Sequence, residues 1–119
     1  MKVNFVRAMM SDMARDAGLE AMVEEALEGM RVTRKAMFGG MAWMYRGNLV
    51  CGARAGFLLV RLGKGNDGWA LELPGVTQMM SGKPMHGWVR VPASVYADDA
   101  VRARLLDGAK AFVETLPAK

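Results

Sequence analysis

The sequence contains a single cysteine, Cys51, and a single histidine, His86, among its 119 residues. One cysteine allows no internal disulfide and is typical of proteins from a reducing compartment. A zinc site needs about four Cys, His or carboxylate ligands at defined spacings, and one cysteine and one histidine do not supply that pattern. The sequence therefore predicts no disulfide framework and no metal centre, and we expect no bound cofactor.

The chain also lacks the uninterrupted apolar run of ~20 residues that a membrane-spanning helix needs. Its first residues include no small-residue cleavage site of the kind that ends a secretory signal. We therefore expect a cytoplasmic protein with no membrane association. Hydrophobic residues make up 52% and charged residues 24% of the chain, which is the mix of a globular domain. We expect one domain over residues 10–119, preceded by an extension over residues 1–9.

Acidic residues are absent from residues 29–66, although the chain contains twelve of them. The same segment holds seven basic residues: Arg31, Arg34, Lys35, Arg46, Arg54, Arg61 and Lys64. Such a concentration of positive charge can recruit an anionic partner. Alternatively, a preceding helix that carries Glu20, Glu24 and Glu28 could lie beside the basic strands and neutralise them. The sequence leaves both interpretations open.

Hydrophobic periodicity predicts helices over residues 11–30, 64–73 and 94–116. Four short strands are expected within residues 32–62 and two more within residues 76–91. This order predicts an α+β fold, a two-layer sandwich in which an antiparallel sheet of about five or six strands is covered on one face by helices.

Two hairpin turns predict which side chains share a face. A two-residue loop at Gly47-Asn48 would pair Met44 with Cys51, and a loop at Ala55-Gly56 would pair Cys51 with Val60. One face then forms the core: Ala42, Met44, Leu49, Cys51, Ala53, Leu58, Val60 and Leu62. The opposite face mixes aromatic, aliphatic and basic residues: Met41, Trp43, Tyr45, Val50, Arg54, Phe57, Leu59 and Arg61.

Five residues of that second face, Trp43, Tyr45, Arg54, Phe57 and Arg61, are the main candidates for a function. Tryptophan, tyrosine and arginine dominate the binding energy of protein interfaces, so we expect a protein partner or a second copy of the chain. Aromatics interleaved with arginines can also stack bases and neutralise phosphates, so a nucleic acid is the alternative partner. Cross-strand cation–π pairs could also produce the same composition with no partner at all.

No catalytic group is predicted. A catalytic pair made of a cysteine nucleophile and a histidine base could come only from Cys51 and His86. Cys51, however, belongs to the predicted core face, where thiols are usually inert. The twelve methionines could form a thioether copper site, at Met9, Met10 and Met13 or at Met79, Met80 and Met85. Many methionines fall on predicted core positions, so they are better explained as side chains that fill gaps in the core. We therefore expect a protein that is not an enzyme.

Two segments carry a family resemblance: RKAMFGGMAWMYRGNLVCG at 34–52 and GKPMHGWVRVP at 82–92. Together they resemble the N-terminal domain of the TfoX/Sxy family. Members of that family typically show an R-x-M-F-G-G strand start, a G-N hairpin and a later G-[KR]-P-M-x-G-[WY]-V strand. The resemblance continues in order and spacing from about Met10 to Pro117.

The resemblance implies a two-layer sandwich similar to the secretion-chaperone-like folds and a bacterial source. Named members regulate natural competence together with a cyclic-AMP receptor-type activator, and they are longer proteins with a second, C-terminal domain. For this chain the resemblance implies a regulatory or protein-interaction module with no catalytic residues. Lys83, His86 and Trp88 of the second motif could line a small-ligand site, which is a further alternative.

Overall fold

A computed structural model describes residues 15–37 and 39–119. The elements follow the order expected from the sequence, with one additional short helix. They are α2 (Ala17–Ala26), β1 (Val32–Met37), β2 (Gly40–Tyr45), β3 (Asn48–Arg54), β4 (Phe57–Arg61), α3 (Gly68–Leu71), β5 (Thr77–Met80), β6 (Pro84–Pro92), α4 (Ala93–Tyr96) and α5 (Asp99–Val113). The six strands form one antiparallel sheet in the order β1-β2-β3-β4-β6-β5. The predicted α+β architecture is confirmed.

Aspartate caps determine where the two longer helices begin. Asp16 and Asp98 each accept a hydrogen bond from the backbone N–H three residues later, at 3.0 Å and 3.1 Å. These bonds satisfy donors that a first turn leaves unpaired. The helix expected over residues 94–116 is therefore divided into α4 and α5, because Asp98 has an extended backbone. The helix expected over 11–30 is α2, and residues 11–14 lie outside the described part.

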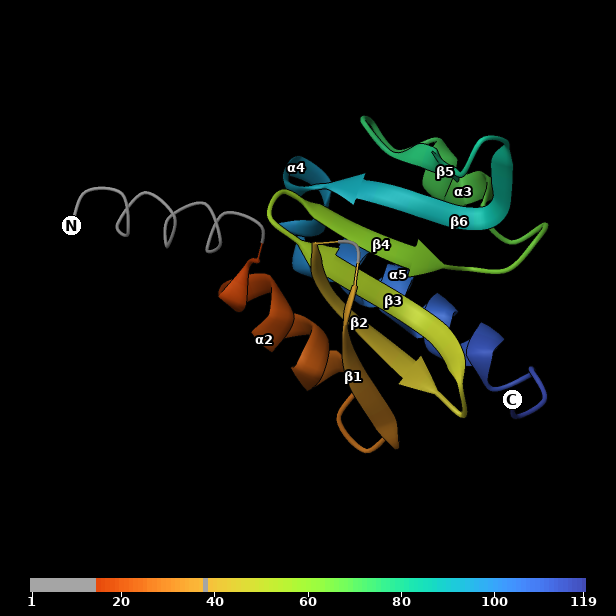
Figure 1. Cartoon of the computed structure of the whole chain (residues 1–119). Coiled ribbons are helices and arrows are strands. Elements are labelled where there is room, and N and C mark those ends of the chain that lie inside the picture. Colours follow the sequence, from red (N-terminus) through yellow and green to blue (C-terminus); the bar gives the residue numbers. More distant parts are fainter. Residues whose placement is uncertain (1–14, 38) are drawn as a thin grey trace.

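The core lies between the sheet and the helices. Helix α5 packs against β3 and β4, and α2 packs against β3 and α5. Figure 1 shows α5 running behind the strands, while the near face of the sheet carries no helix of the described part. Buried side chains from both layers fill the interface: Leu19, Val23, Leu27, Trp43, Cys51, Leu58, Val60, Val89, Val91, Leu105, Leu106, Ala109 and Val113.

The β3–β4 hairpin has the expected register, whereas the β2–β3 hairpin is shifted by one residue. Across the β3–β4 hairpin, Cys51 pairs with Val60, as predicted. The β2–β3 turn is formed by Arg46 and Gly47 rather than by residues 47–48. The φ angle is 51° at Arg46 and 82° at Gly47. Positive φ at both central positions is characteristic of a type I′ turn, whose twist suits a hairpin. A shift of one residue exchanges the two faces of β2.

Trp43 consequently points into the core and not onto the open face. It pairs with Cys51 in place of the predicted Met44, and its side chain is fully buried. An irregularity beside it makes Val50 an extra residue of β3, so that Val50 and Cys51 are both buried. Met44 and Leu49, which the sequence assigned to the core, are only half-buried. The predicted face of β2 is wrong.

The C-terminal segment is joined to this hairpin by Asn48. The Asn48 amide is buried and donates a hydrogen bond to the carbonyl of Pro117 at 2.9 Å. The backbone N–H of Lys119 donates to the carbonyl of Arg46 at 2.8 Å. The asparagine of the G-N motif therefore contributes a tertiary contact in addition to its place beside the turn.

Asn48→Ala is expected to lower the free energy of unfolding by about 0.5–1.5 kcal/mol, because it removes the hydrogen bond from the buried Asn48 amide to the carbonyl of Pro117. Urea unfolding followed by circular dichroism measures the change. Asn66→Ala is the matched control, since the exposed Asn66 amide also donates to a backbone carbonyl, that of Leu62 at 3.2 Å. Equal losses in the two variants would contradict a structural role for Asn48.

Candidate interaction face

Strand pairing brings six side chains together on the face of the sheet that is opposite to α5. Paired residues of neighbouring antiparallel strands share a face. Arg54 pairs with Phe57, Leu59 with Arg90, and Arg61 with Trp88. We call this set the outer face: Arg54, Phe57, Leu59, Arg61, Trp88 and Arg90.

The outer face differs from the predicted set at two positions. Arg54, Phe57 and Arg61 lie on it as expected. Trp43 does not, because the register shift buries it in the core. Tyr45 is half-buried and packs against the core. The assignment of Trp43 and Tyr45 to the same face as the arginines is therefore wrong.

Arginines on the outer face stack on its aromatic rings. The guanidinium carbon of Arg90 lies 3.6 Å from the centroid of the Phe57 ring. That of Arg61, at the end of β4, lies 4.9 Å from the Trp88 ring and 5.3 Å from the ring of Phe112, which belongs to α5, so the Arg61 side chain also contacts the helix layer. Burial lowers the pKa of Arg61 below its ordinary value, although arginine keeps its charge in proteins. Stacking on a ring holds each guanidinium group in place.

The positive charge of the strands is neutralised on one side of the sheet only. Arg34 of β1 forms ion pairs with Glu20 at 3.3 Å and with Glu24 at 2.8 Å, and Arg15 pairs with Glu20 at 2.6 Å. Neutralisation by the preceding helix therefore applies to Arg34, while the arginines of the outer face stay available for an anionic partner. Helix α2 compensates Arg34, whereas Lys35 of β1 and the arginines of the outer face form no ion pair within the described residues.

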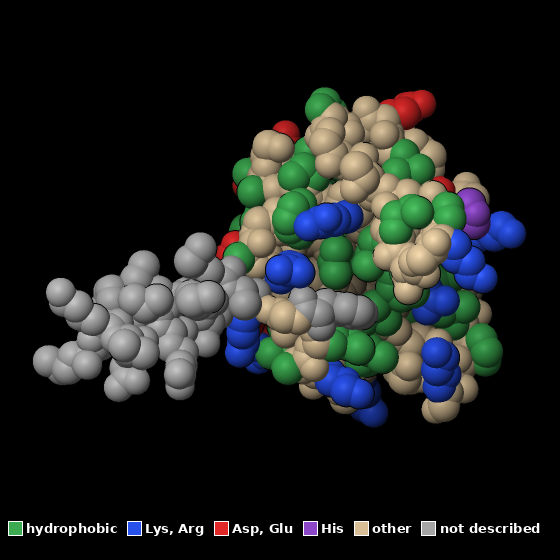
Figure 2. All heavy atoms as spheres, turned by 45° about the horizontal axis from the view of Figure 1, so that its top comes forward, with side chains coloured by type: hydrophobic (Ala, Val, Ile, Leu, Met, Phe, Trp, Pro, Cys, Tyr) green, Lys and Arg blue, Asp and Glu red, His purple; other side chains and the backbone are tan. Residues whose placement is uncertain are grey.

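Within residues 15–37 and 39–119, no carboxylate forms an ion pair with Arg54, Arg61 or Arg90. In Figure 2, which views the molecule from the side of the strands, basic side chains alternate with hydrophobic ones across the face, and acidic side chains stand at its margins. The outer face therefore carries arginines whose charge no described neighbour offsets.

A hollow of about 480 Å³ opens on the outer face between β3, β4, β6 and the edge strand β5. Arg54 and Arg90 line it, and the buried Leu59 lies on the strand between theirs. The remaining wall comes from β5: Thr77, Gln78, Met79 and Met80. Met80 is 63% exposed, which is unusual for a large apolar side chain. The hollow thus combines an apolar interior with two positive groups.

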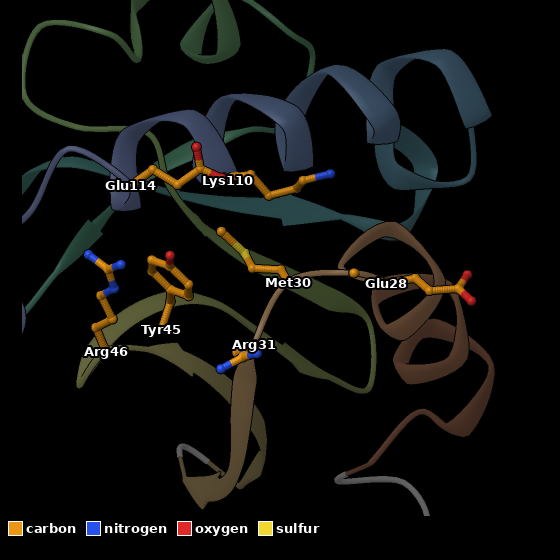
Figure 3. A pocket seen from close by; sticks show the side chains of 8 residues that line it. Glu28, Met30, Arg31, Tyr45, Arg46, Lys110 and Glu114 are labelled. Atoms are coloured by element: carbon orange, nitrogen blue, oxygen red, sulfur yellow. The ribbon is translucent and has the colours of Figure 1, made fainter.

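Tyr45 lines a second hollow, of about 700 Å³, between the β2–β3 hairpin and α5 (Figure 3). Arg46 lies over the Tyr45 ring at 5.2 Å, and Lys110 and Glu114 project from α5. The Lys110 ammonium donates to the carbonyl of Ala26 at 3.1 Å and so caps the end of α2. Charges of both signs surround this hollow, so it favours neither an anion nor a cation.

The only thiol and the only imidazole of the chain are not brought together. Cys51 is buried on the core face of β3, and burial raises the pKa of its thiol. His86 is exposed, and its Nδ1 lies 3.2 Å from the side-chain nitrogen of Gln78. A buried thiol that resists ionisation is a poor nucleophile. The described geometry gives Cys51 no base to activate it.

The other candidate groups lie apart. Trp88 belongs to the outer face, whereas Lys83 and His86 are exposed around the β5–β6 turn and do not line the hollow beside it. In the part of the chain that the structure describes, no three His, Cys, Asp or Glu side chains gather as a metal site, and no helix is long and apolar enough to cross a membrane. The methionine candidates at positions 9, 10 and 13 fall outside the described residues.

Two members of the outer face were missed by the sequence reasoning. Arg90 was assigned to no site, and Trp88 was placed beside Lys83 and His86. The alternation in WVRV at 88–91 indicates that Trp88 and Arg90 share a face. It does not indicate which strand lies beside them, because β6 pairs with β4 across an intervening helix and strand.

A family model described as the TfoX N-terminal domain matches residues 10–112 of the chain. Both motif segments noted in the sequence lie within the matched range. No curated protein and no solved structure matches the chain.

Proposed function

The chain belongs to the TfoX N-terminal domain family, and we propose that it acts as a non-catalytic regulatory module that binds a protein partner through the outer face. The observation that carries this proposal is the set of three arginines that no described carboxylate offsets, two of them stacked on aromatic rings. Arginine and tryptophan are enriched among the residues that dominate binding at protein interfaces.

The stacking also bears on what kind of partner fits. Holding a guanidinium on a ring before binding reduces the side-chain entropy that association must overcome. The donors of Arg61 and Arg90 are thus presented in a fixed arrangement, which suits the geometry of carboxylate oxygens. A partner with acidic groups gains most from this arrangement.

A nucleic acid is the second candidate, since the same arginines can contact phosphates. Single-stranded nucleic acids also require free aromatic faces on which bases stack. Here Arg90 covers one face of the Phe57 ring and Arg61 lies over Trp88. Bases would have to displace these guanidinium groups or use the opposite ring faces, so a protein partner agrees better with the geometry.

Site-specific photo-crosslinking tests the proposal. A benzophenone amino acid at Met80, which is exposed beside the hollow, should capture a protein when cells that carry the native gene are irradiated. The same probe at Ala103, which is exposed on α5, is the control on the opposite side of the molecule. Mass spectrometry identifies the adduct, and an adduct of two copies of this chain would identify a homodimer.

Arg90→Glu should lower the yield of the Met80 adduct by about tenfold, because it reverses a charge within the contact. Arg104→Glu is the matched control, since Arg104 also stacks on an aromatic ring, that of Trp69 at 3.8 Å, but on α5. Equal adducts from Met80 and Ala103, or a Met80 adduct that nuclease removes, would overturn the proposal of a protein partner at the outer face.

A further inference from the structure

We infer that the hollow on the outer face receives an apolar side chain from a partner segment whose flanking residues are acidic. This inference rests on the proposed function and specifies the chemistry of the partner. It follows from how the polar and apolar groups of the hollow are placed.

The interior of the hollow is built to receive apolar atoms. Leu59 is 7% exposed and pairs with Gly52 on β3, which has no side chain. The Leu59 side chain lies over Gly52, with its Cδ1 3.6 Å from the place where a Gly52 Cβ would be, and it lines the hollow. Met79 and Met80 complete the wall from β5, and flexible thioether side chains adapt to apolar groups of different shapes.

Two positive side chains line the hollow beside its apolar ones. Arg54 is exposed at the end of β3, and Arg90 is exposed on β6, with its guanidinium held over Phe57. Neither has an acidic partner among the described residues. A ligand that fills the hollow lies beside both arginines, so carboxylates that flank its apolar group can pair with them.

The size of the hollow agrees with a side chain of a protein segment. About 480 Å³ lies within the range of pockets that enclose a drug-sized ligand, ~300–1,000 Å³, and so has room for one or two large aliphatic side chains. A nucleic acid would place phosphates at the arginines and would leave the thioether wall without an apolar group to cover it. We therefore commit to a protein segment in which one or two large aliphatic residues are flanked by Asp or Glu.

Fluorescence anisotropy with synthetic peptides tests this inference on the full chain. The probe is a fluorescein-labelled peptide of about ten residues with two central leucines flanked by glutamates. One control peptide replaces the leucines with serine, and the other replaces the glutamates with glutamine. The parent peptide should bind at least about tenfold more tightly than either control, since each control removes one of the two contacts.

Charge reversal at the arginines of the hollow should weaken binding of the parent peptide. Arg54→Glu and Arg90→Glu are each expected to raise Kd by about tenfold or more, and Arg104→Glu by less than about twofold. Arg54 stacks on no ring in the described structure, so Arg54→Glu remains informative if Arg90→Glu disturbs the fold. Circular dichroism confirms that each variant is folded.

Four results would overturn the inference. Equal affinity for the serine peptide would show that no apolar group enters the hollow. Tighter binding of a ten-nucleotide single-stranded DNA would identify a nucleic acid as the better ligand. Absence of peptide binding, while the Met80 probe still captures a protein, would refute this partner chemistry and leave the proposed function standing. Loss of both the peptide binding and the Met80 adduct would refute this inference and the proposed function together.

Discussion

Trp43→Ala is expected to lower the free energy of unfolding by about 3–5 kcal/mol, the cost of removing a large aromatic side chain from a close-packed core. Trp43 is fully buried and is among the largest side chains of the core. It pairs with Cys51 on β3 and with Arg34 on β1, and its side chain belongs to the core cluster between the sheet and the helices. Since small domains have a total stability of about 5–15 kcal/mol, this loss would leave the variant partly unfolded at physiological temperature.

Trp43→Phe is the control that separates packing from the indole N–H. The Trp43 Nε1 is buried without a hydrogen-bond partner among the described residues, and such a group destabilises a fold by about 1–3 kcal/mol. Phenylalanine keeps much of the apolar volume and removes this group, so the variant should lose much less stability than Trp43→Ala. Urea denaturation of both variants measures the difference. A folded Trp43→Ala protein of normal stability that fails only in partner binding would place Trp43 at the interface and contradict the core assignment.

Gly87→Ala is the second change with a large expected effect, a loss of about 3 kcal/mol or more. Gly87 has φ of 90° in the middle of β6, a conformation that costs a residue with a Cβ about 1–3 kcal/mol. A Cβ at this position would also collide with the backbone of Gly63 and lie 2.5 Å from the nitrogen of Lys64. The backbone carbonyl of Gly87 accepts hydrogen bonds from Leu62 at 2.7 Å and from Gly63 at 3.2 Å, so the collision cannot be relieved without breaking these bonds.

Gly82→Ala is the matched control for Gly87→Ala. Gly82 also has positive φ, 73°, but nothing lies within 4 Å of the place where its Cβ would be. Alanine there should cost only the backbone strain, about 1–2 kcal/mol. The free energies of unfolding of the two variants, measured by thermal unfolding, should differ by the cost of the backbone collision. A loss at Gly87 no greater than that at Gly82 would show that the close approach to the chain at 63–64 is not required for folding.

Local patterns in the sequence predicted the elements and their order well. The alternation between Val32 and Leu62, with its glycine punctuation, predicted consecutive hairpins, and the β3–β4 register followed from its turn. The prediction failed at the β2–β3 turn, where Arg46 adopts positive φ at a cost that glycine would avoid. A shift of the turn by one residue changes the face on which every side chain of the strand lies. This single error in the predicted turn assigned Trp43 and Tyr45 to the wrong face of the sheet.

The arginines of the predicted set did assemble with an aromatic ring, as expected, but the tryptophan that joins them is Trp88 and not Trp43. By itself the sequence determined the α+β class, the concentration of basic residues in the strands and the absence of a thiol–imidazole pair close along the chain. Only the tertiary structure decided which arginines lie free of carboxylates, and that Arg90 and Trp88 complete the outer face. The reason is physical: β4 meets β6 through pairing between distant segments, which hydrophobic periodicity does not encode. The compensation of charge likewise depends on which strand a helix covers once both are folded.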